Sequence, residues 1–287
     1  MENLLLGLSE GAAIAMAAVG FTLVWKVSGF VNLSLGAYFV GGGLVSWAFD
    51  AEVGLPLFTS VLLAVAACTV LAFVLQSRVI TILTQRPIFY NIVLTYALGL
   101  GITGVLGMLL SADYRSVPIS LATTYFTQGE FNLSLLLPIS IVLALVTTVV
   151  VVSISERTTF GLMARAVSSD KTLATLTGVN TPRTIALIAA LGAFMAALGG
   201  SIFAMSSPIS SGSFEQITLY MASAAIIGGL GSLWRSFFMA VGLVALGSLL
   251  SLEVPSGFID IVILLLMVVV LARRYDVFSP AHMRSRR

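Results

Sequence analysis

The chain has 287 residues, of which 59% are hydrophobic and 9% are charged, and its formal net charge is +2. Soluble domains carry about 25% charged residues. This composition, with a mean hydropathy of +1.09, therefore excludes a water-soluble globular protein and indicates a membrane protein. At about 20 residues per span, residues 1–287 form a single membrane domain of about eight to ten helices. The only cysteine, Cys68, excludes a disulfide framework and a cysteine zinc site.

Nine apolar segments are predicted to cross the membrane. In chain order they are Leu4–Trp25, Val27–Phe49, Leu57–Leu75, Ile88–Leu110, Leu133–Val152, Thr184–Met205, Ile217–Leu233, Phe237–Leu252 and Ile259–Leu271. The second and seventh contain several glycines and can be discontinuous or re-entrant. Residues Met1–Asn3 carry no basic side chain, so the first segment is predicted to be a span and not a cleaved signal peptide. The fold class is therefore an all-α polytopic membrane protein.

Positive charges gather on one side of this topology. If the basic tail, residues 273–287, is cytoplasmic, alternation places thirteen of the fourteen basic residues inside and leaves Arg115 outside. The acidic residues Glu2, Asp50, Glu52, Asp113, Glu130, Glu215 and Glu253 then fall outside. This asymmetry predicts an odd number of crossings, with the N-terminus outside and the C-terminus cytoplasmic.

The topology also has the form of an inverted repeat. Four spans precede the fifth segment and four follow it, and the two sets run in opposite directions. The second and seventh segments correspond, and both contain glycines: Gly29, Gly36, Gly41, Gly42 and Gly43 in one, and Gly228, Gly229 and Gly231 in the other. Matched broken segments indicate a transport pathway. Close packing of helices on glycine explains the same pattern equally well.

Few ionisable residues fall inside the spans, where such groups are costly and usually functional. The exceptions are Glu10 and Asp260, and both are predicted to reach the outer interface. The single histidine, His282, lies in the tail, and no phosphate-binding lysine loop occurs. No enzymatic site is therefore predicted, and no cofactor is expected on this chain. If ATP drives the protein, ATP and Mg²⁺ bind to another subunit.

The longest interior connection, residues 153–183, contains its own helical pattern. Between Phe160 and Leu176, apolar residues alternate with basic and hydroxyl residues, and Gly178 follows as a helix C-cap. The pattern predicts a short amphipathic helix at the cytoplasmic face. A helix resting on the lipid interface is the alternative.

Three motifs, in order along most of the chain, resemble the branched-chain amino acid ABC permease family. Residues 161–200 are similar to its cytoplasmic coupling loop and following span, through Gly161, Arg165, Ala166, Asp170, Ala174, Gly178, Val179 and Asn180. Residues 20–42 are similar to its broken second-helix region, and residues 226–238 to its glycine motif. The chain looks like the shorter permease subunit of this family, which also includes urea and short-amide carriers. Leu35 stands where the family commonly has histidine, so the substrate is not carried over directly.

The resemblance implies several partners. They are a second permease subunit, with a heterodimer favoured, two cytoplasmic ATP-binding subunits and an extracytoplasmic solute-binding protein. It implies that Gly161, Arg165, Ala166, Asp170, Ala174 and Gly178 belong to the loop that couples to the ATPase. Membrane lipid surrounds the chain, and no nucleic acid is expected. The location implied is the plasma (inner) membrane of a prokaryote.

The predicted substrate pathway combines hydrogen-bonding side chains with exposed backbone. Its residues are Asn32, Ser34, Gly36, Tyr38, Gly41, Gly42, Gly43, Gly228 and Gly229. Capping of the broken helices by the same side chains is the equal alternative. The predicted function is inward transport of a small solute, a branched-chain or hydrophobic amino acid first and urea or a short amide next. An ATP-independent channel or facilitator is the competing function.

Overall fold

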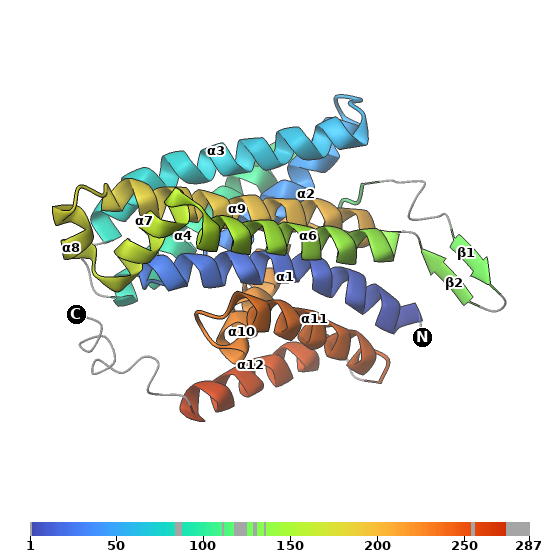
Figure 1. The fold of residues 1–287 in the computed structure, drawn as a ribbon. Coiled ribbons are helices and arrows are strands. Elements are labelled where there is room, and N and C mark those ends of the chain that lie inside the picture. Colours follow the sequence, from blue (N-terminus) through green and yellow to red (C-terminus); the bar gives the residue numbers. More distant parts are fainter. Residues whose placement is uncertain are drawn as a thin grey trace.

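The computed structural model describes residues 2–83, 88–110, 112–117, 125–128, 131–134, 136–253 and 256–273. The tail beyond Arg273, with His282, and residue Glu130 lie outside the described residues. The elements are α1 (Glu2–Ser28), α2 (Leu35–Ala51), α3 (Leu57–Leu83), α4 (Ile88–Leu110), β1 (Tyr125–Gln128), β2 (Phe131–Ser134), α6 (Leu136–Arg157), α7 (Thr159–Ser169), α8 (Lys171–Leu176), α9 (Thr181–Ser206), the 3₁₀ turn η1 (Ser211–Ser213), α10 (Phe214–Gly228), α11 (Leu233–Leu250) and α12 (Ser256–Arg273). Figure 1 shows a bundle of roughly parallel long helices.

Each of the nine predicted spans overlaps one long helix, which confirms the all-α polytopic fold. Six described helices are long and apolar enough to cross a membrane: α1, α3, α4, α6, α9 and α11. The helices of the two glycine-containing segments are shorter, with 17 residues in α2 and 15 in α10. Many large apolar side chains of α3, α4, α6 and α12 are exposed on the outside of the bundle. This is the arrangement expected for helices that face lipid.

Two local predictions were wrong. The fifth span was expected from Leu133, but that residue belongs to a two-stranded antiparallel hairpin, in which Tyr125 pairs with Ser134, and the helix begins at Leu136. The interior connection forms two helices and not one. The Asp170 backbone is extended, and its side chain accepts hydrogen bonds from the first N–H groups of α8, so α7 ends where α8 begins.

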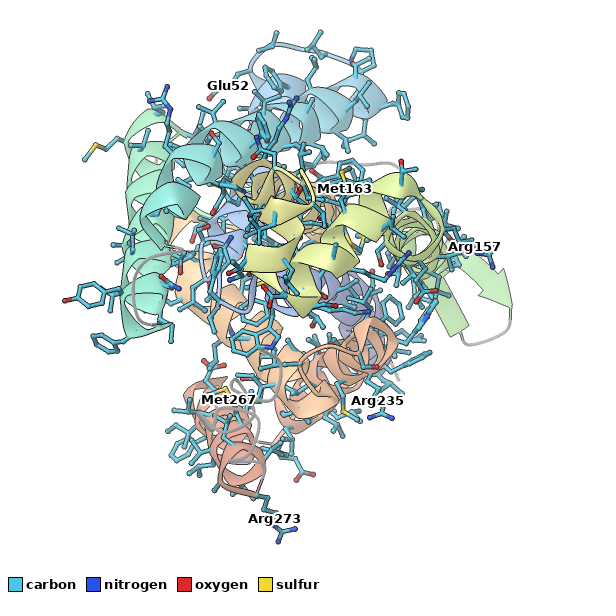
Figure 2. All side chains as sticks on the ribbon, turned by 60° about the vertical axis from the view of Figure 1, so that its left-hand side comes forward. Glu52, Arg157, Met163, Arg235, Met267 and Arg273 are labelled. Carbon is cyan, nitrogen blue, oxygen red and sulfur yellow. The ribbon has the colours of Figure 1, made fainter. Side chains whose placement is uncertain are left out.

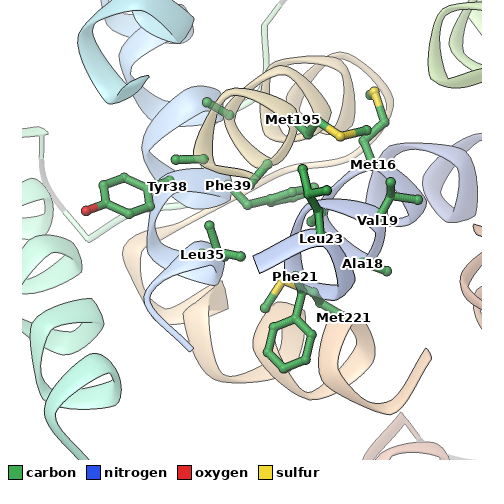
Figure 3. Packing of buried hydrophobic residues seen from close by; sticks show 14 of the residues in the cluster. Met16, Ala18, Val19, Phe21, Leu23, Leu35, Tyr38, Phe39, Met195 and Met221 are labelled. Carbon is green, nitrogen blue, oxygen red and sulfur yellow. The ribbon is translucent and has the colours of Figure 1, made fainter. Parts of the chain in front are cut away.

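Helices α1 and α9 form the centre of the bundle. Within their most apolar windows, 72% of α1 and 78% of α9 is buried, against 17% of α4. The two helices touch backbone to backbone, because a Cβ added at Gly20 would lie 2.7 Å from the carbonyl oxygen of Gly192. The side chains of Met16, Phe39 and Met195 pack beside this crossing (Figure 3). Only glycine permits an approach this close between two helices.

The packing supports the inverted repeat. In the first half α3 lies against α9, and in the second half α11 lies against α1. Likewise α4 packs on α2, and α12 packs on α10. Each half therefore packs one of its helices on the central helix of the other half, α3 on α9 and α11 on α1, as expected for inverted halves.

The helix breaks lie at other positions than predicted. Gly36, Gly41, Gly42 and Gly43 lie inside the continuous helix α2, and the chain is instead broken before it, over residues 29–34. The corresponding break before α10 covers residues 207–213. Gly229 and Gly231, with φ of +92° and +118°, form the tight turn between α10 and α11. These glycines are needed there because few other residues adopt positive φ.

Replacement of Gly42 by alanine tests the packing. An added Cβ would lie 2.6 Å from the carbonyl carbon of Ala197 in α9, and overpacking of this kind costs about 1–3 kcal/mol. We expect Gly42→Ala to lower the thermal unfolding temperature of the purified protein in detergent.

The matched control is Gly101→Ala in α4, where an added Cβ meets no atom within 4 Å. We expect its unfolding temperature to be unchanged or higher, because alanine favours helix over glycine. Equal unfolding temperatures for the two variants would contradict the close α2–α9 contact.

Candidate functional site

A buried polar cluster surrounds the break between α1 and α2. The Ser34 Oγ donates to Asn32 Oδ1 at 2.7 Å, and Gln76 Nε2 of α3 donates to Ser34 Oγ at 3.0 Å. All three residues are at most 1% exposed. The break is therefore lined by neutral amide and hydroxyl groups inside an apolar bundle.

Thr95 of α4 holds the backbone of this break. Its hydroxyl accepts from the Leu33 N–H at 3.2 Å and lies 3.3 Å from the Val31 carbonyl oxygen. It also donates to the carbonyl of Asn91, one turn earlier on α4, at 2.7 Å. Backbone groups without helical partners must be satisfied within a membrane protein, and Thr95 does this for the broken segment.

Four buried polar atoms around the break have no hydrogen-bond partner in the described part of the chain. They are Asn32 Nδ2, Tyr38 Oη, Gln76 Oε1 and Asn91 Oδ1. The Tyr38 ring projects from α2 away from Met16 and Met195 in Figure 3, and it is buried, with its hydroxyl in the neighbourhood of Gln76 and Ser34. Burying unpaired polar groups is costly, so this cluster is suited to a polar ligand or to water.

Three predicted pathway residues, Asn32, Ser34 and Tyr38, are brought together here. Sequence reasoning missed Gln76 and Asn91, each a lone amide within an apolar helix. The signal in the sequence was the amide itself, because amide side chains in membrane spans commonly hydrogen-bond across helices. The position of both residues on buried faces comes from the structure.

The predicted pathway glycines have packing contacts. An added Cβ would meet Thr218 of α10 at Gly36, Cys68 of α3 at Gly41, Ala197 of α9 at Gly42, Gly200 of α9 at Gly43 and Arg235 of α11 at Gly228. Gly229 ends α10 in the tight turn already described. These contacts favour the close-packing explanation of the glycine pattern over direct contact with a solute.

The residues predicted to couple to an ATPase organise the α7–α8 loop. Arg165 Nη1 donates to the carbonyls of Ser155 and Glu156 at the end of α6, at 2.6 and 3.0 Å. Gly161 lies so close to the Ser155 backbone that a Cβ would clash with it. Gly178, at φ +89°, lies directly after Thr177, the C-cap of α8, in the left-handed conformation with which a glycine ends a helix. Ala166 is partly buried and Ala174 is buried, so both pack inward.

Apolar side chains of the same loop remain uncovered. Leu162 of α7 is 62% exposed, and Leu173 and Leu176 of α8 are 60% and 78% exposed. We refer to these three residues as the loop leucines. They lie at the end of the bundle opposite the β-hairpin (Figure 1).

Glu10 lies toward the hairpin end of the bundle. Its carboxylate accepts a hydrogen bond from the hydroxyl of Ser207, in the break before α10. The partner accounts for a polar residue within α1, since a carboxylate in a span requires one.

A bundle of long apolar helices around a buried polar cluster defines a multi-pass membrane protein of the permease class. Residues 3–271 match the family model described as branched-chain amino acid transport system / permease component. The chain belongs to this family, whose members are ABC importer permeases.

Several curated relatives are similar over most of the chain. The branched-chain amino acid permease protein BraD of Pseudomonas aeruginosa is 25% identical over 81% of this chain and 80% of the relative. LivH of Escherichia coli K12, named for the same transport system, is 27% identical over 94% and 92%. The fructose import permease protein FruF of Bifidobacterium longum is 26% identical over 81% of this chain but only 64% of its own length. Relatives within one family are therefore named for different solutes.

The unpaired cluster predicts an unusual stability effect for Gln76→Met. This substitution removes a buried acceptor without a partner and also the 3.0 Å hydrogen bond from Gln76 Nε2 to Ser34 Oγ, while retaining the side-chain length. We expect an unfolding temperature close to that of the parent, because removal of the unpaired acceptor's desolvation penalty offsets the lost hydrogen bond of about 0.6 kcal/mol.

Ser46→Ala is the control. Ser46 lies in α2, where its hydroxyl hydrogen-bonds to Gly42 and Ser201 at 2.6 and 2.8 Å. Its loss should lower the stability by about 0.6 kcal/mol, the average for such bonds in membrane proteins. A larger loss of stability in Gln76→Met than in Ser46→Ala would show that the amide is structural.

Proposed function

We propose that the chain is the transmembrane subunit of an ATP-driven importer, and that the polar cluster beside the α1–α2 break contacts the solute. The observation that carries this proposal is the set of four unpaired polar atoms on three helices and one broken segment. Discontinuous helices with polar groups are the usual location of substrate sites in transporters. Membership of an importer permease family supports the same function.

The chemistry of the cluster restricts the solute. Asn32 and Tyr38 offer N–H and O–H donors, while Gln76 and Asn91 offer carbonyl acceptors, and none of the four carries a formal charge. Donors suit a carboxylate, and acceptors suit an ammonium group, so a zwitterionic amino acid fits. The names of BraD and LivH favour a branched-chain amino acid. A sugar such as fructose is the second candidate because of FruF.

The α7–α8 end is proposed to face the cytoplasm. Helices α6 and α12 end there and α11 begins there, so Arg157, Arg235 and Arg273 border this end (Figure 2). Basic residues are concentrated on the cytoplasmic side of membrane proteins. We place the loop leucines in contact with a cytoplasmic ATP-binding subunit, since exposed apolar residues on a water-facing loop indicate an interface. A second permease subunit and an external solute-binding protein complete the complex.

Leu173→Glu tests the contact with the ATPase. Leu173 is 60% exposed within α8, so the substitution leaves the packing of this chain largely intact. We expect the ATP-binding subunit, co-expressed from the neighbouring genes, to be lost on purification in mild detergent. Burial of an unpaired carboxylate in the interface opposes docking.

Thr172→Glu is the matched control, because it adds the same charge one residue earlier. This residue is exposed in the first turn of α8, where an acidic side chain favours the helix. We expect its complex to survive. Retention of the ATPase by Leu173→Glu would contradict docking at the loop leucines.

Uptake of radiolabelled L-leucine and fructose into liposomes separates the candidate functions. We expect ATP-dependent accumulation of leucine by the complete complex, and its loss in Gln76→Met at an unfolding temperature close to that of the parent. Uptake by the chain alone, without ATP, would instead establish the facilitator. Accumulation of fructose and not leucine would reject the amino acid as solute.

A further inference from the structure

A lysine joins the loop between α6 and α9 to the end of α1. Lys171 is the first residue of α8, and its Nζ donates to the carbonyl oxygen of Ser28, the last residue of α1, at 2.6 Å. The residue as a whole is exposed, but its ammonium end lies against protein, and this burial lowers the pKa of the lysine. The two residues are 143 positions apart in the chain.

The contact lies at the point where α1 stops being a helix. The last carbonyls of a helix have no helical N–H partner, and Lys171 supplies a donor for one of them. Gly29 follows at φ +71°, and the Phe30 N–H bonds to the Ser28 side chain at 3.2 Å. A cation is favoured at this helix terminus by the helix dipole. The Lys171 ammonium group therefore hydrogen-bonds to the backbone of Ser28, the residue directly before the broken segment.

From Ser28 the connection to the polar cluster is short. Asn32 follows four residues later, a path of at most about 14 Å along an extended chain. Phe30 is buried within this segment, and the Leu33 N–H is hydrogen-bonded to Thr95. The segment therefore has little room to change its conformation without moving Asn32. A displacement of Ser28 would consequently move Asn32 relative to Gln76.

Helix α8 is also connected to the other central helix. The hydroxyl of Thr175 hydrogen-bonds to that of Thr181, the first residue of α9, at 2.9 Å. Helix α7 is hydrogen-bonded through Arg165 to α6, and it also packs on α1 and α9. Among the described side-chain hydrogen bonds of the loop, those of α8 reach the last residue of α1 and the first residue of α9.

We propose that Lys171 is a positioning residue that transmits movement of α8 to the α1–α2 break and so changes the geometry of the polar cluster. This inference rests on the proposed function, since the movement comes from the docked ATPase. Lys171 itself does not contact the solute. It acts through the backbone of Ser28.

The test measures the broken segment directly and needs no transported solute. The only native cysteine, Cys68, is replaced by alanine, and Leu33→Cys places a reporter in the break. The complex with its ATPase is reconstituted in nanodiscs, and the rate of N-ethylmaleimide labelling is compared with and without ATP and Mg²⁺. ATP hydrolysis is recorded in the same samples. The variants are Lys171→Met, Lys171→Arg and Lys26→Met.

We expect ATP to change the labelling rate about fivefold with Lys171 present, at the lower end for coupled sites. Lys171→Met should bind the ATPase and hydrolyse ATP but show no change in labelling, and Lys171→Arg, which keeps a donor, should restore it. Lys26→Met removes an equal charge from an exposed residue in the last turn of α1 and should behave as the parent.

A full ATP response in Lys171→Met would overturn the inference. Loss of the ATPase from that variant would also overturn it, because the lysine would then serve docking and not transmission. If the parent complex neither retains an ATPase nor responds to ATP, the proposed function itself fails. The parent sample thus distinguishes the two failures.

Discussion

The contact between Gly20 of α1 and Gly192 of α9 is the constraint on which the rest of the bundle depends. Without side chains at these positions the two backbones meet, and each half of the inverted repeat can pack across the other. Gly42 and Gly43 of α2 extend the same close packing along α9. In lipid, where apolar surface gives helices little reason to associate, such contacts supply much of the attraction.

Close packing at the centre contrasts with poor polar pairing at its edge. The α1–α2 break lies beside this tight core, yet four polar atoms around it lack partners. A bundle selected for stability alone would satisfy or remove them. Local departure from good packing is expected where a protein handles a ligand. The tight core keeps the broken segment in place while its side chains remain available.

The sequence was sufficient for features that depend on composition over many residues. Among the described residues, apolar length located the helices α1 to α4, α6 and α9 to α12. Charge asymmetry predicted that α1 begins and α12 ends at opposite ends of the bundle (Figure 1). Asn32, Ser34 and Tyr38 could be selected because they are adjacent to glycines in one apolar segment. The helix end at Gly178 could be predicted from its position after a short amphipathic pattern, and this glycine follows the C-cap Thr177 with positive φ.

Features set by contacts distant in the chain could not be predicted in this way. Gln76 and Asn91 join the cluster through the packing of α3 and α4, which no local pattern encodes. Asp170 resembles an anchor for a partner, but its carboxylate caps α8. The glycines of α2 suggest a broken helix, whereas they fit against neighbouring helices, Gly42 and Gly43 against α9. The hairpin strands of four residues each are too short to give a periodic signal.

The most direct measurement for this account is the structure of the complete complex, determined by electron cryomicroscopy with L-leucine bound. The account predicts solute density at the α1–α2 break, within hydrogen-bonding distance of Asn32, Gln76 and Asn91. Density at another position, with these three side chains still without partners, would contradict it.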